Sequence, residues 1–372
     1  MTKRGAHITI IFSKGKMIGV QNKIKQFASA FNKQNFDVIV LNRDIDGCFD
    51  GVSYINYEDK YPGWSARFIR YYLVSKLIKL DKYHRLIIRY PLFDFSWFSI
   101  SSHIKKVYFE HHTMELEELK KSGLNFFAKN IQYLAEKYFS PYFFKKCGGH
   151  LSVTSQISGY QKSRFGANKE YIVFSNGFNP EFYKKYAKKH EQESTQSKSG
   201  IFKIVYIASE FKEWHGLDRL LNAAQDYCGN QIIEVNLIGM LSPEQVASLQ
   251  GIKKINVTFK LHGKLSHIES LQIINECDLG IDSLALDRLG FTVSSTLKSK
   301  EYIALGKPFI SLTPDQDLIE FENKLWFKPS LRNETFDFLE VVNWFNSIDQ
   351  LKINLESLSW NCKVRKLICI VG

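Results

Sequence analysis

The stretch Thr296-Leu-Lys-Ser-Lys-Glu-Tyr-Ile-Ala-Leu-Gly-Lys-Pro-Phe-Ile310 contains the clearest structural signal in the sequence. Apolar residues recur in it at nearly helical spacing until Gly306 and Pro308, which are typical of a helix end. Short apolar runs at residues 277–282 and 309–312 flank this helix and indicate buried strands. A strand, a helix and a second strand in this order predict an α/β fold with a parallel sheet.

The helix expected over residues 297–305 carries two charged residues near its start, Lys298 and Glu301. In open α/β sheets ligands bind where helices follow the carboxyl ends of strands, helped by free backbone N–H groups. A lysine there can contact phosphate, and a carboxylate can accept hydrogen bonds from the hydroxyls of a ribose. An amphipathic helix whose acid complements the helix dipole would explain the same residues without a ligand.

Strand and helix patterns alternate in both halves of the chain, on either side of a polar, Ser-rich segment at residues 184–200. The chain has 372 residues, which exceeds the ~250–300 residues of a single core. We therefore expect two doubly wound, Rossmann-like domains facing a cleft, at residues 1–183 and 201–335, joined by a linker at 184–200.

The composition is basic and aromatic, with a net charge of +12, 29 Phe, 18 Tyr and 6 Trp. Such a chain suits phosphorylated small molecules, an anionic membrane or nucleic acid. No nucleic-acid module is evident, so we expect no nucleic-acid partner. The sequence has no run near the ~20 apolar residues of a membrane helix and no signal peptide, which predicts a cytoplasmic protein.

Glu110, His111 and His112 follow a predicted strand at residues 106–109. A metal site is disfavoured, because adjacent residues on a strand face opposite sides and zinc needs three or four convergent ligands. Buried histidines with a structural role would explain His111 and His112 equally well.

The order Lys298-x-x-Glu301-Tyr-x-Ala-x-Gly306-x-Pro308 resembles the Lys-x-x-Glu-Tyr-Met-Ala-x-Gly-x-Pro signature of retaining glycosyltransferases of family 4, in particular the bacterial surface-polysaccharide type. These enzymes have the GT-B fold. The resemblance implies an acceptor-binding first domain, a nucleotide-sugar-binding second domain, and C-terminal helices at residues 336–372 that pack back toward the first domain. It implies neither a metal nor another cofactor.

For the donor, the resemblance implies that Glu301 binds the ribose and that Lys298, with Arg288 or His215, stabilises the diphosphate. The chain departs from the family pattern, because His215 stands where a Lys is usual and Val293 where a Glu is usual. Which basic residue replaces the usual Arg and Lys therefore stays open. The other donor-binding candidates lie near two predicted helix starts: Gly216, Arg219, Ser294, Ser295, Thr296 and Leu297.

For the acceptor side, the resemblance implies that a histidine after a first-domain strand contacts the transferred sugar. His112 is the preferred match and joins Lys298 and Glu301 as a candidate catalytic residue. Glu110, His111 and Gly19, the last in an expected loop, are the candidate acceptor-binding residues.

Residues 124–146 alternate aromatic residues with lysines on a longer and a shorter predicted helix, divided near Pro141. The aromatics either fill the core, with the lysines in water, or form a surface for an anionic membrane. With the resemblance, the second possibility implies transfer of a sugar to a lipid-linked or oligosaccharide acceptor at the inner face of a bacterial membrane. The products would be surface polysaccharides such as lipopolysaccharide or capsule.

Two other functions fit the same fold. One is a non-catalytic assembly partner, since the acid usual at Val293 is missing; the other is a nucleotide-sugar epimerase. The first would turn over nothing, and the second would need no acceptor.

Overall fold

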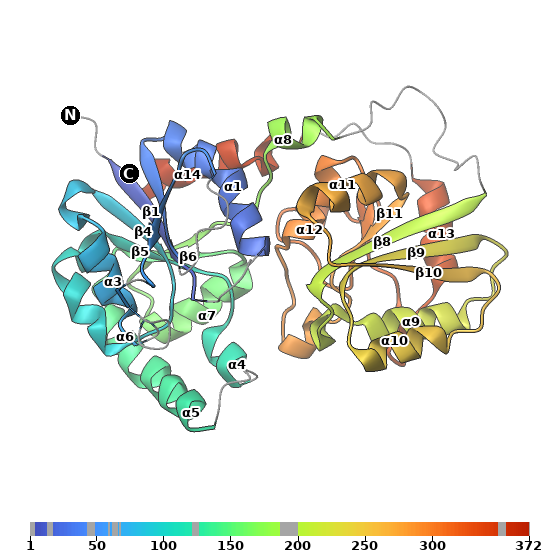
Figure 1. Ribbon diagram of the computed structural model, residues 1–372, viewed down its shortest axis with the longest axis horizontal. Helices are drawn as coiled ribbons and strands as arrows, with labels where there is room; N and C mark the ends of the chain where they lie inside the picture. The colour runs from blue at the N-terminus through green and yellow to red at the C-terminus, as the bar shows by residue number, and fades with distance from the viewer. Residues whose placement is uncertain are drawn as a thin grey trace. The chain divides into compact units, whose positions relative to one another are not determined.

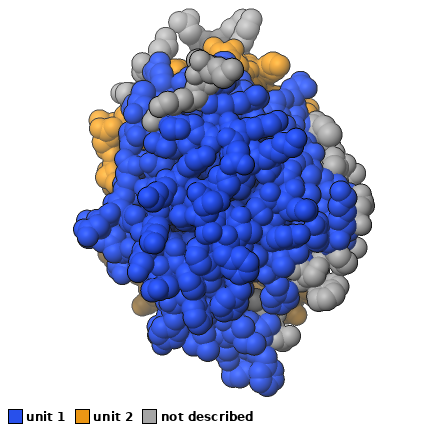
Figure 2. Space-filling view, turned by 90° about the vertical axis from the view of Figure 1, so that its left-hand side faces the viewer, with its two compact units in different colours: residues 1–175, 360–372 blue, residues 176–359 orange. Residues whose placement is uncertain are grey.

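The computed structural model describes residues 4–12, 18–42, 49–58, 60–61, 66, 68–120, 126–186, 200–348 and 355–371. The chain forms two compact units, shown in Figures 1 and 2. Unit 1 contains residues 1–175 and 360–372, and unit 2 contains residues 176–359. Each unit has its own parallel sheet and its own apolar cores.

The sheet of unit 1 has the strand order β3-β2-β1-β4-β5-β6-β7, and every neighbouring pair is parallel. The order reverses between β1 and β4, which is the position where open α/β sheets bind ligands. The strands are β1 (Gly5–Ile10), β2 (Phe36–Asn42), β3 (Val52–Asn56), β4 (Arg85–Arg89), β5 (Val107–His111), β6 (Gly149–Ser152) and β7 (Glu170–Val173).

Alternate residues of these strands point to opposite faces of the sheet, and each face has an apolar core. Helices α1 (Ile18–Lys33) and α14 (Trp360–Val371) contribute to one core, where the rings of Phe27 and Trp360 lie 5.6 Å apart. The other helical segments are α3 (Arg70–Leu77), η1 (Leu80–Lys82), η2 (Phe95–Lys106), α4 (Glu115–Lys120), α5 (Phe126–Leu134), η3 (Ala135–Phe139), α6 (Ser140–Phe144) and α7 (Ser155–Phe165).

The sheet of unit 2 has the order β10-β9-β8-β11-β12-β13, again parallel throughout, and it reverses between β8 and β11. Its strands are β8 (Ile201–Glu210), β9 (Ile232–Met240), β10 (Val257–Gly263), β11 (Leu279–Ile281), β12 (Phe309–Ile310) and β13 (Trp326–Phe327). A small antiparallel pair joins β14 (Leu331–Arg332) and β15 (Thr335–Phe336).

The helices of unit 2 also supply two cores, one on each face of the sheet. Helices α9 (Leu217–Asp226) and α13 (Phe338–Ser347) contribute to one core, and α11 (His267–Glu276) and α12 (Leu297–Ala304) contribute to the other. The remaining helical segments are α8 (Pro180–Lys184), η4 (Glu213–His215), α10 (Pro243–Gln250), η5 (Leu286–Leu289), η6 (Ile319–Phe321) and η7 (Glu356–Leu358).

The stretch that starts at Thr296 folds as its pattern predicts. Thr296 caps α12 by accepting a hydrogen bond from the backbone N–H of Ser299. At the other end Gly306 has φ of +71°, a conformation that glycine adopts without strain. The N–H groups of Gly306 and Lys307 donate to the carbonyls of Ile303 and Tyr302, which is the Schellman pattern of a helix end. The predicted β11-α12-β12 order is confirmed.

The chain passes from unit 1 to unit 2 near residue 176 and returns to unit 1 near residue 360. Residues 176–183, placed in the first domain by the sequence analysis, lie in unit 2, where Tyr183 shares a core with Tyr302. Of residues 336–372, α13 lies in unit 2, whereas α14 packs on α1 in unit 1. Most of the expected linker, residues 187–199, lies outside the described residues.

The segment rich in aromatics and lysines contains two helices, α5 and α6, joined by the π-helical turn η3. Leu134 and Ser140, which flank that turn, both keep right-handed helical dihedrals. The wider turn precedes Pro141, whose ring lacks an N–H and would clash with a carbonyl four residues earlier in a regular helix. None of the described helices has the length and apolar character needed to cross a bilayer.

Candidate functional site

The loops after β8 and β11 meet at the point where the strand order of unit 2 reverses. The N–H groups of Leu284 and Ala285 donate to the carbonyls of His215 and Trp214, at 2.9 and 3.2 Å. Gly216 has φ of +72°, and a Cβ atom there would lie 3.0 Å from Leu284 and Ala285. The candidate Gly216 therefore has a structural reason to be glycine, because it lets the two loops pack together.

Helix α12 begins at this junction. Thr296 donates a hydrogen bond to Asp282, 2.9 Å away at the end of β11, while it caps the helix. Leu297 is the first residue of α12 and is partly exposed. The first N–H groups of a helix have no intrahelical partner, so this end can bind an anion.

Lys298 lies in the first turn of α12, and its side chain is 16% exposed. Its Nζ atom lies 3.2 Å from the hydroxyl of Ser283 and 3.5 Å from the carboxylate of Asp282, above the ring of Tyr206. Burial lowers the pKa of Lys298, and burial also raises the pKa of Asp282. The ammonium group is thus held in place by contacts that compensate its charge only in part.

Glu301 lies one turn further along α12. Its Oε1 atom accepts hydrogen bonds from the hydroxyl of Tyr183 at 3.1 Å and from Nε2 of His267 at 2.9 Å. The ring of His267 stacks on Phe182, with the ring planes 8° apart. These two contacts orient the carboxylate. Neither of them uses Oε2, which can therefore accept a hydrogen bond from a hydroxyl group.

His215 ends the loop after β8. Its Nδ1 atom accepts a hydrogen bond from the backbone N–H of Lys212, at 2.9 Å. Burial, reinforced by the charge of Lys298, lowers the pKa of His215 to about 3. The ring is therefore neutral near pH 7, and because Nδ1 accepts, the hydrogen resides on Nε2. His215 can act as a hydrogen-bond donor to phosphate, and it supplies no positive charge.

The two candidate arginines have other partners. All five N–H groups of Arg219 are used, by Glu334, Asp287 and the carbonyl of Leu284. Arg288 forms ion pairs with Asp218 at 2.6 Å and with Glu334 at 2.7 Å. These arginines join η5 to α9 and to the β14-β15 turn. The expectation that they bind the diphosphate is at odds with this geometry, because their charge is already compensated by carboxylates.

The serines before α12 are also engaged inside unit 2. Ser295 accepts a hydrogen bond from the backbone N–H of Asn176, at 2.9 Å, and Ser294 forms a backbone pair with Pro314. Both serines and Val293 are buried. Ser294 and Ser295 therefore support the loop that leads into α12, and their hydroxyl groups have partners inside unit 2.

In unit 1, Glu110 is the centre of a buried polar cluster at the end of β5. Its carboxylate accepts hydrogen bonds from His7 at 2.8 Å and from Lys23 at 2.9 Å, and Nε2 of His112 lies 3.2 Å away. Burial alone would raise the pKa of Glu110, but Lys23 and His112 hold it well below the usual range. Glu110 therefore orients its neighbours and, being 1% exposed, is not placed to contact an acceptor directly.

His112 is the partly exposed member of this cluster, with 16% of its side chain accessible. Burial, together with the charges of Arg89 and Lys23, lowers the pKa of His112 to about 3. A neutral imidazole at the carboxyl end of β5 can exchange hydrogen bonds with a sugar hydroxyl. It is not a general acid at neutral pH.

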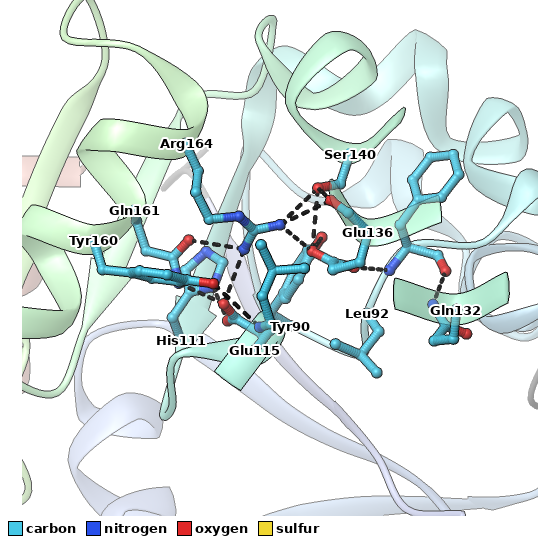
Figure 3. A network of polar contacts seen from close by, with 12 residues as sticks. Tyr90, Leu92, His111, Glu115, Gln132, Glu136, Ser140, Tyr160, Gln161 and Arg164 are labelled. Atoms are coloured by element: carbon cyan, nitrogen blue, oxygen red, sulfur yellow. Dashed lines mark hydrogen bonds and ion pairs between the residues drawn. The ribbon is translucent and has the colours of Figure 1, made fainter. Parts of the chain in front are cut away.

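His111 points to the opposite face of the sheet, as strand alternation requires. It is fully buried, with Nδ1 against Glu115 at 2.5 Å and Nε2 against His150 at 3.0 Å. Figure 3 shows the contact between His111 and Glu115 as part of a network in which Arg164 pairs with both Glu115 and Glu136. His111 is thus a structural residue and not the acceptor contact expected from the sequence.

Gly19 lies within the first turn of α1 and is exposed, whereas the sequence analysis expected it in a loop. A Cβ atom there would meet no neighbour within 4 Å. The expected loop is therefore wrong at this position, and the contact of Gly19 with an acceptor stays a prediction.

Several residues that position the candidates were missed by the sequence analysis. Tyr183 and His267 orient Glu301, Asp282 lies beside Lys298, and His7 and Lys23 hold Glu110. His267 begins a helix and Asp282 follows a strand, whereas the positions of Tyr183, His7 and Lys23 gave no such signal. Their partners are far away in the sequence, so no local pattern connects them.

No protein-family model matches the sequence, and none of the curated proteins matches it. Solved structures match over nearly the whole chain. A glycosyltransferase from Rickettsia africae has 14% identity and a TM-score of 0.63, covering 100% of this chain and 98% of its own. The lipopolysaccharide outer core galactosyltransferase WaaB has 14% identity and a TM-score of 0.56, with 98% of each chain covered. HepE from Anabaena, in complex with UDP and glucose, has 13% identity and a TM-score of 0.57, covering 97% of this chain and 94% of its own.

At these identities the similarity establishes the fold. The chain has two doubly wound α/β units and matches glycosyltransferases of the GT-B fold, so the predicted fold class is confirmed. Several of the matching enzymes act in lipopolysaccharide biosynthesis or are bound to a nucleotide-sugar, which is a property of those proteins.

Proposed function

We propose that this chain is a retaining glycosyltransferase that moves a sugar from a nucleotide-diphosphate sugar to a lipid-linked glycan acceptor in bacterial surface-polysaccharide biosynthesis. The single observation that carries the proposal is the arrangement on α12. Lys298 and Glu301 share a helix start at the reversal point of a parallel sheet. An anion site and an oriented carboxylate one turn apart match the diphosphate and ribose of such a donor.

Each residue near α12 has a distinct role in this proposal. The Oε2 atom of Glu301, which has no partner among the described residues, accepts hydrogen bonds from the ribose, while Tyr183 and His267 keep the carboxylate in place. The ammonium of Lys298, the Nε2 hydrogen of His215 and the first N–H groups of α12 stabilise the diphosphate as negative charge develops on it.

On the acceptor side, His112 exchanges a hydrogen bond with the transferred sugar. Retention proceeds by front-face attack: the acceptor oxygen bonds to the anomeric carbon on the side from which the diphosphate leaves, and a phosphate oxygen takes the acceptor proton. This scheme follows from the resemblance to family 4 and requires no nucleophile from the chain. No metal or cofactor takes part.

A thermal-shift screen tests the donor site. The protein is incubated with UDP, GDP, ADP, CMP and their common sugar conjugates, since a ligand at about 100 times its Kd stabilises the folded state by ~2.7 kcal/mol. We expect one nucleotide family to raise the Tm, and the Glu301→Ala variant to lose most of that rise. Glu320→Ala removes an exposed acid from η6 of the same unit and is the matched control.

Turnover then distinguishes the alternatives. Transfer to an acceptor, followed by mass spectrometry, supports the proposal, whereas an epimerised sugar nucleotide without acceptor indicates an epimerase. A folded protein whose Tm responds to no nucleotide would refute the donor site and favour a non-catalytic assembly partner.

A further inference from the structure

The outer surface of α5, η3 and α6 carries a continuous apolar stripe. Phe127, Ile131, Leu134, Tyr138 and Tyr142 recur at intervals of four, three, four and four residues, which places them on one side of the helical run. All five are exposed, with Phe127 and Ile131 at 78% and 65%. Five consecutive members of a helical stripe left in water are unusual for a soluble surface.

The stripe continues onto η2, which lies against the same helices. Phe95 and Phe98 on η2 are exposed, and the rings of Phe95 and Phe139 lie 5.4 Å apart. Trp97 stacks on Phe143 with ring centroids 4.4 Å apart. We call the exposed residues of η2, α5, η3 and α6 together the aromatic face.

Positive charge flanks the aromatic face. Lys137, Lys145 and Lys146 are exposed and Lys129 is half-buried. The ammonium groups of Lys137 and Lys145 lie 5.2 and 4.4 Å from the ring centroids of Tyr138 and Tyr142.

The only acid between residues 126 and 146 is Glu136, which points inward and pairs with Arg164. Residues 95–106 contain no acid at all. The aromatic face therefore presents lysines and aromatic rings but no carboxylate of its own.

We propose that the aromatic face is the surface by which this protein binds an anionic lipid bilayer. The exposed Phe and Tyr rings enter the headgroup region, with the tyrosine hydroxyl groups toward water, and the adjacent lysines contact the anionic headgroups. The charge pattern favours a bilayer over a protein partner, since an acid-free set of lysines beside exposed rings matches a surface that is both apolar and uniformly negative.

The inward-facing side of α5, η3 and α6 is bonded to the rest of unit 1. Glu136, turned inward by η3, pairs with Arg164 and accepts hydrogen bonds from Tyr90 and the N–H of Phe93 (Figure 3). Arg164 also pairs with Glu115, which contacts His111 on β5. Lipid bound at the aromatic face would thus be held at a fixed position relative to the strand that ends beside His112, the residue assigned to the acceptor side under the proposed function.

Vesicle flotation tests the lipid surface without any substrate. The full chain is mixed with vesicles of phosphatidylcholine alone or with phosphatidylglycerol added. We expect binding only to the anionic vesicles, and we expect the triple variant Phe127→Ser, Ile131→Ser, Tyr138→Ser to reduce it by about tenfold or more. A triple variant of exposed residues in unit 2, Ile255→Ser, Ile268→Ser, Ile319→Ser, is the control and should bind like the wild type.

A second variant separates charge from apolar contact. Replacing Lys129, Lys137, Lys145 and Lys146 by Gln should weaken binding to anionic vesicles by about tenfold or more, and the loss should grow smaller as salt is raised. Because Lys137, Lys145 and Lys146 are exposed and Lys129 is only partly buried, circular dichroism and the nucleotide-induced Tm shift should match the wild type.

Equal binding to neutral vesicles, or equal loss in the control variant, would overturn the proposal. The proposal would also be overturned if the protein bound no vesicles but formed a dimer that the Ser variants dissociate. The aromatic face would then join two copies of the chain. The proposed function is tested separately: a protein that floats with vesicles but responds to no nucleotide refutes the transferase and leaves the lipid surface standing.

Discussion

Lys298 and Lys300 lie two residues apart on α12, and the structure predicts opposite consequences of replacing them. Lys300 is fully buried between the carboxylates of Asp315 and Asp317, the latter 2.9 Å away. Lys298 is partly exposed and has a looser contact with Asp282, at 3.5 Å. We expect Lys300→Met to destabilise the fold, and we expect Lys298→Met to weaken nucleotide binding in a protein that stays folded.

The loss of stability expected for Lys300→Met follows from the buried charges around Lys300. Removing one partner of a buried ion pair costs about 3–5 kcal/mol, because the remaining charge is left without compensation. For a unit of residues 176–359 this lowers the Tm by about 6–20 °C. Burial alone would lower the pKa of Lys300, but Asp315 and Asp317 raise it above its usual value. The folded-state pKa exceeds the unfolded one, so this stabilisation is fully present at neutral pH and is lost only at strongly alkaline pH.

For Lys298→Met the loss appears in binding. Hydrogen bonds to charged groups contribute about 1.5–3 kcal/mol, so the Kd for the stabilising nucleotide should rise about 10- to 150-fold. The Tm without ligand should change by only about 3 °C or less, since burial already disfavours the charged amine and no close ion pair is broken.

Differential scanning calorimetry and isothermal titration calorimetry measure both quantities on the same preparations. The double variant Lys300→Met, Asp315→Asn should recover part of the lost stability, because it removes one of the uncompensated carboxylates. The reasoning fails if Lys300→Met melts like the wild type, or if Lys298→Met is destabilised as strongly as Lys300→Met.

Three further predictions concern the same unit. Tyr183→Phe removes one of the two hydrogen bonds that orient Glu301, so nucleotide affinity should fall about 5-fold by titration calorimetry, and an unchanged Kd would contradict the orienting role. Arg219→Met should lower the Tm yet leave the nucleotide Kd within about 2-fold, because its donors serve internal acceptors; a larger loss of affinity would return Arg219 to the donor site. The pKa of His215 is about 3 when folded against 6.5 as the reference, so the unfolded state binds the proton first and stability should fall as pH drops from about 6.5. His215→Asn should show a shallower fall in Tm between pH 6.5 and 5, and parallel curves would count against a buried neutral ring.

Local signals made much of the fold predictable. The order β11-α12-β12, the cap at Thr296 and the helix end at Gly306 each depend on residues within a few positions of one another. Alternating strand and helix patterns likewise indicated two doubly wound units. The segment at residues 176–183 was placed in the wrong unit because its local pattern is typical of the end of a domain. Tyr183 instead packs beside Glu301, which lies 118 positions later in the sequence.

The candidate site was less predictable, because the sequence shows which residues are basic but not which carboxylates they meet. Arg219 pairs with Asp287 and Glu334, 68 and 115 positions away. Its position near the start of α9 therefore does not reveal that its N–H groups already have partners. The same limit applies to His111, which strand alternation turns away from Glu110 and into a network with Glu115 and His150.

These pairings explain why the proposed donor site uses Lys298 and not Arg219, Arg288 or Lys300. Arg219 and Arg288 share the carboxylates of Asp218, Asp287 and Glu334, and Lys300 has two of its own. Among the described residues, Lys298 forms one ion pair, with an aspartate whose own pKa burial raises. Of these four basic residues Lys298 is therefore the least compensated, and it lies where the helix start adds its N–H groups. A diphosphate would supply the missing negative charge to groups that folding has already desolvated and oriented, and such preorganisation favours a leaving group that gains charge during transfer.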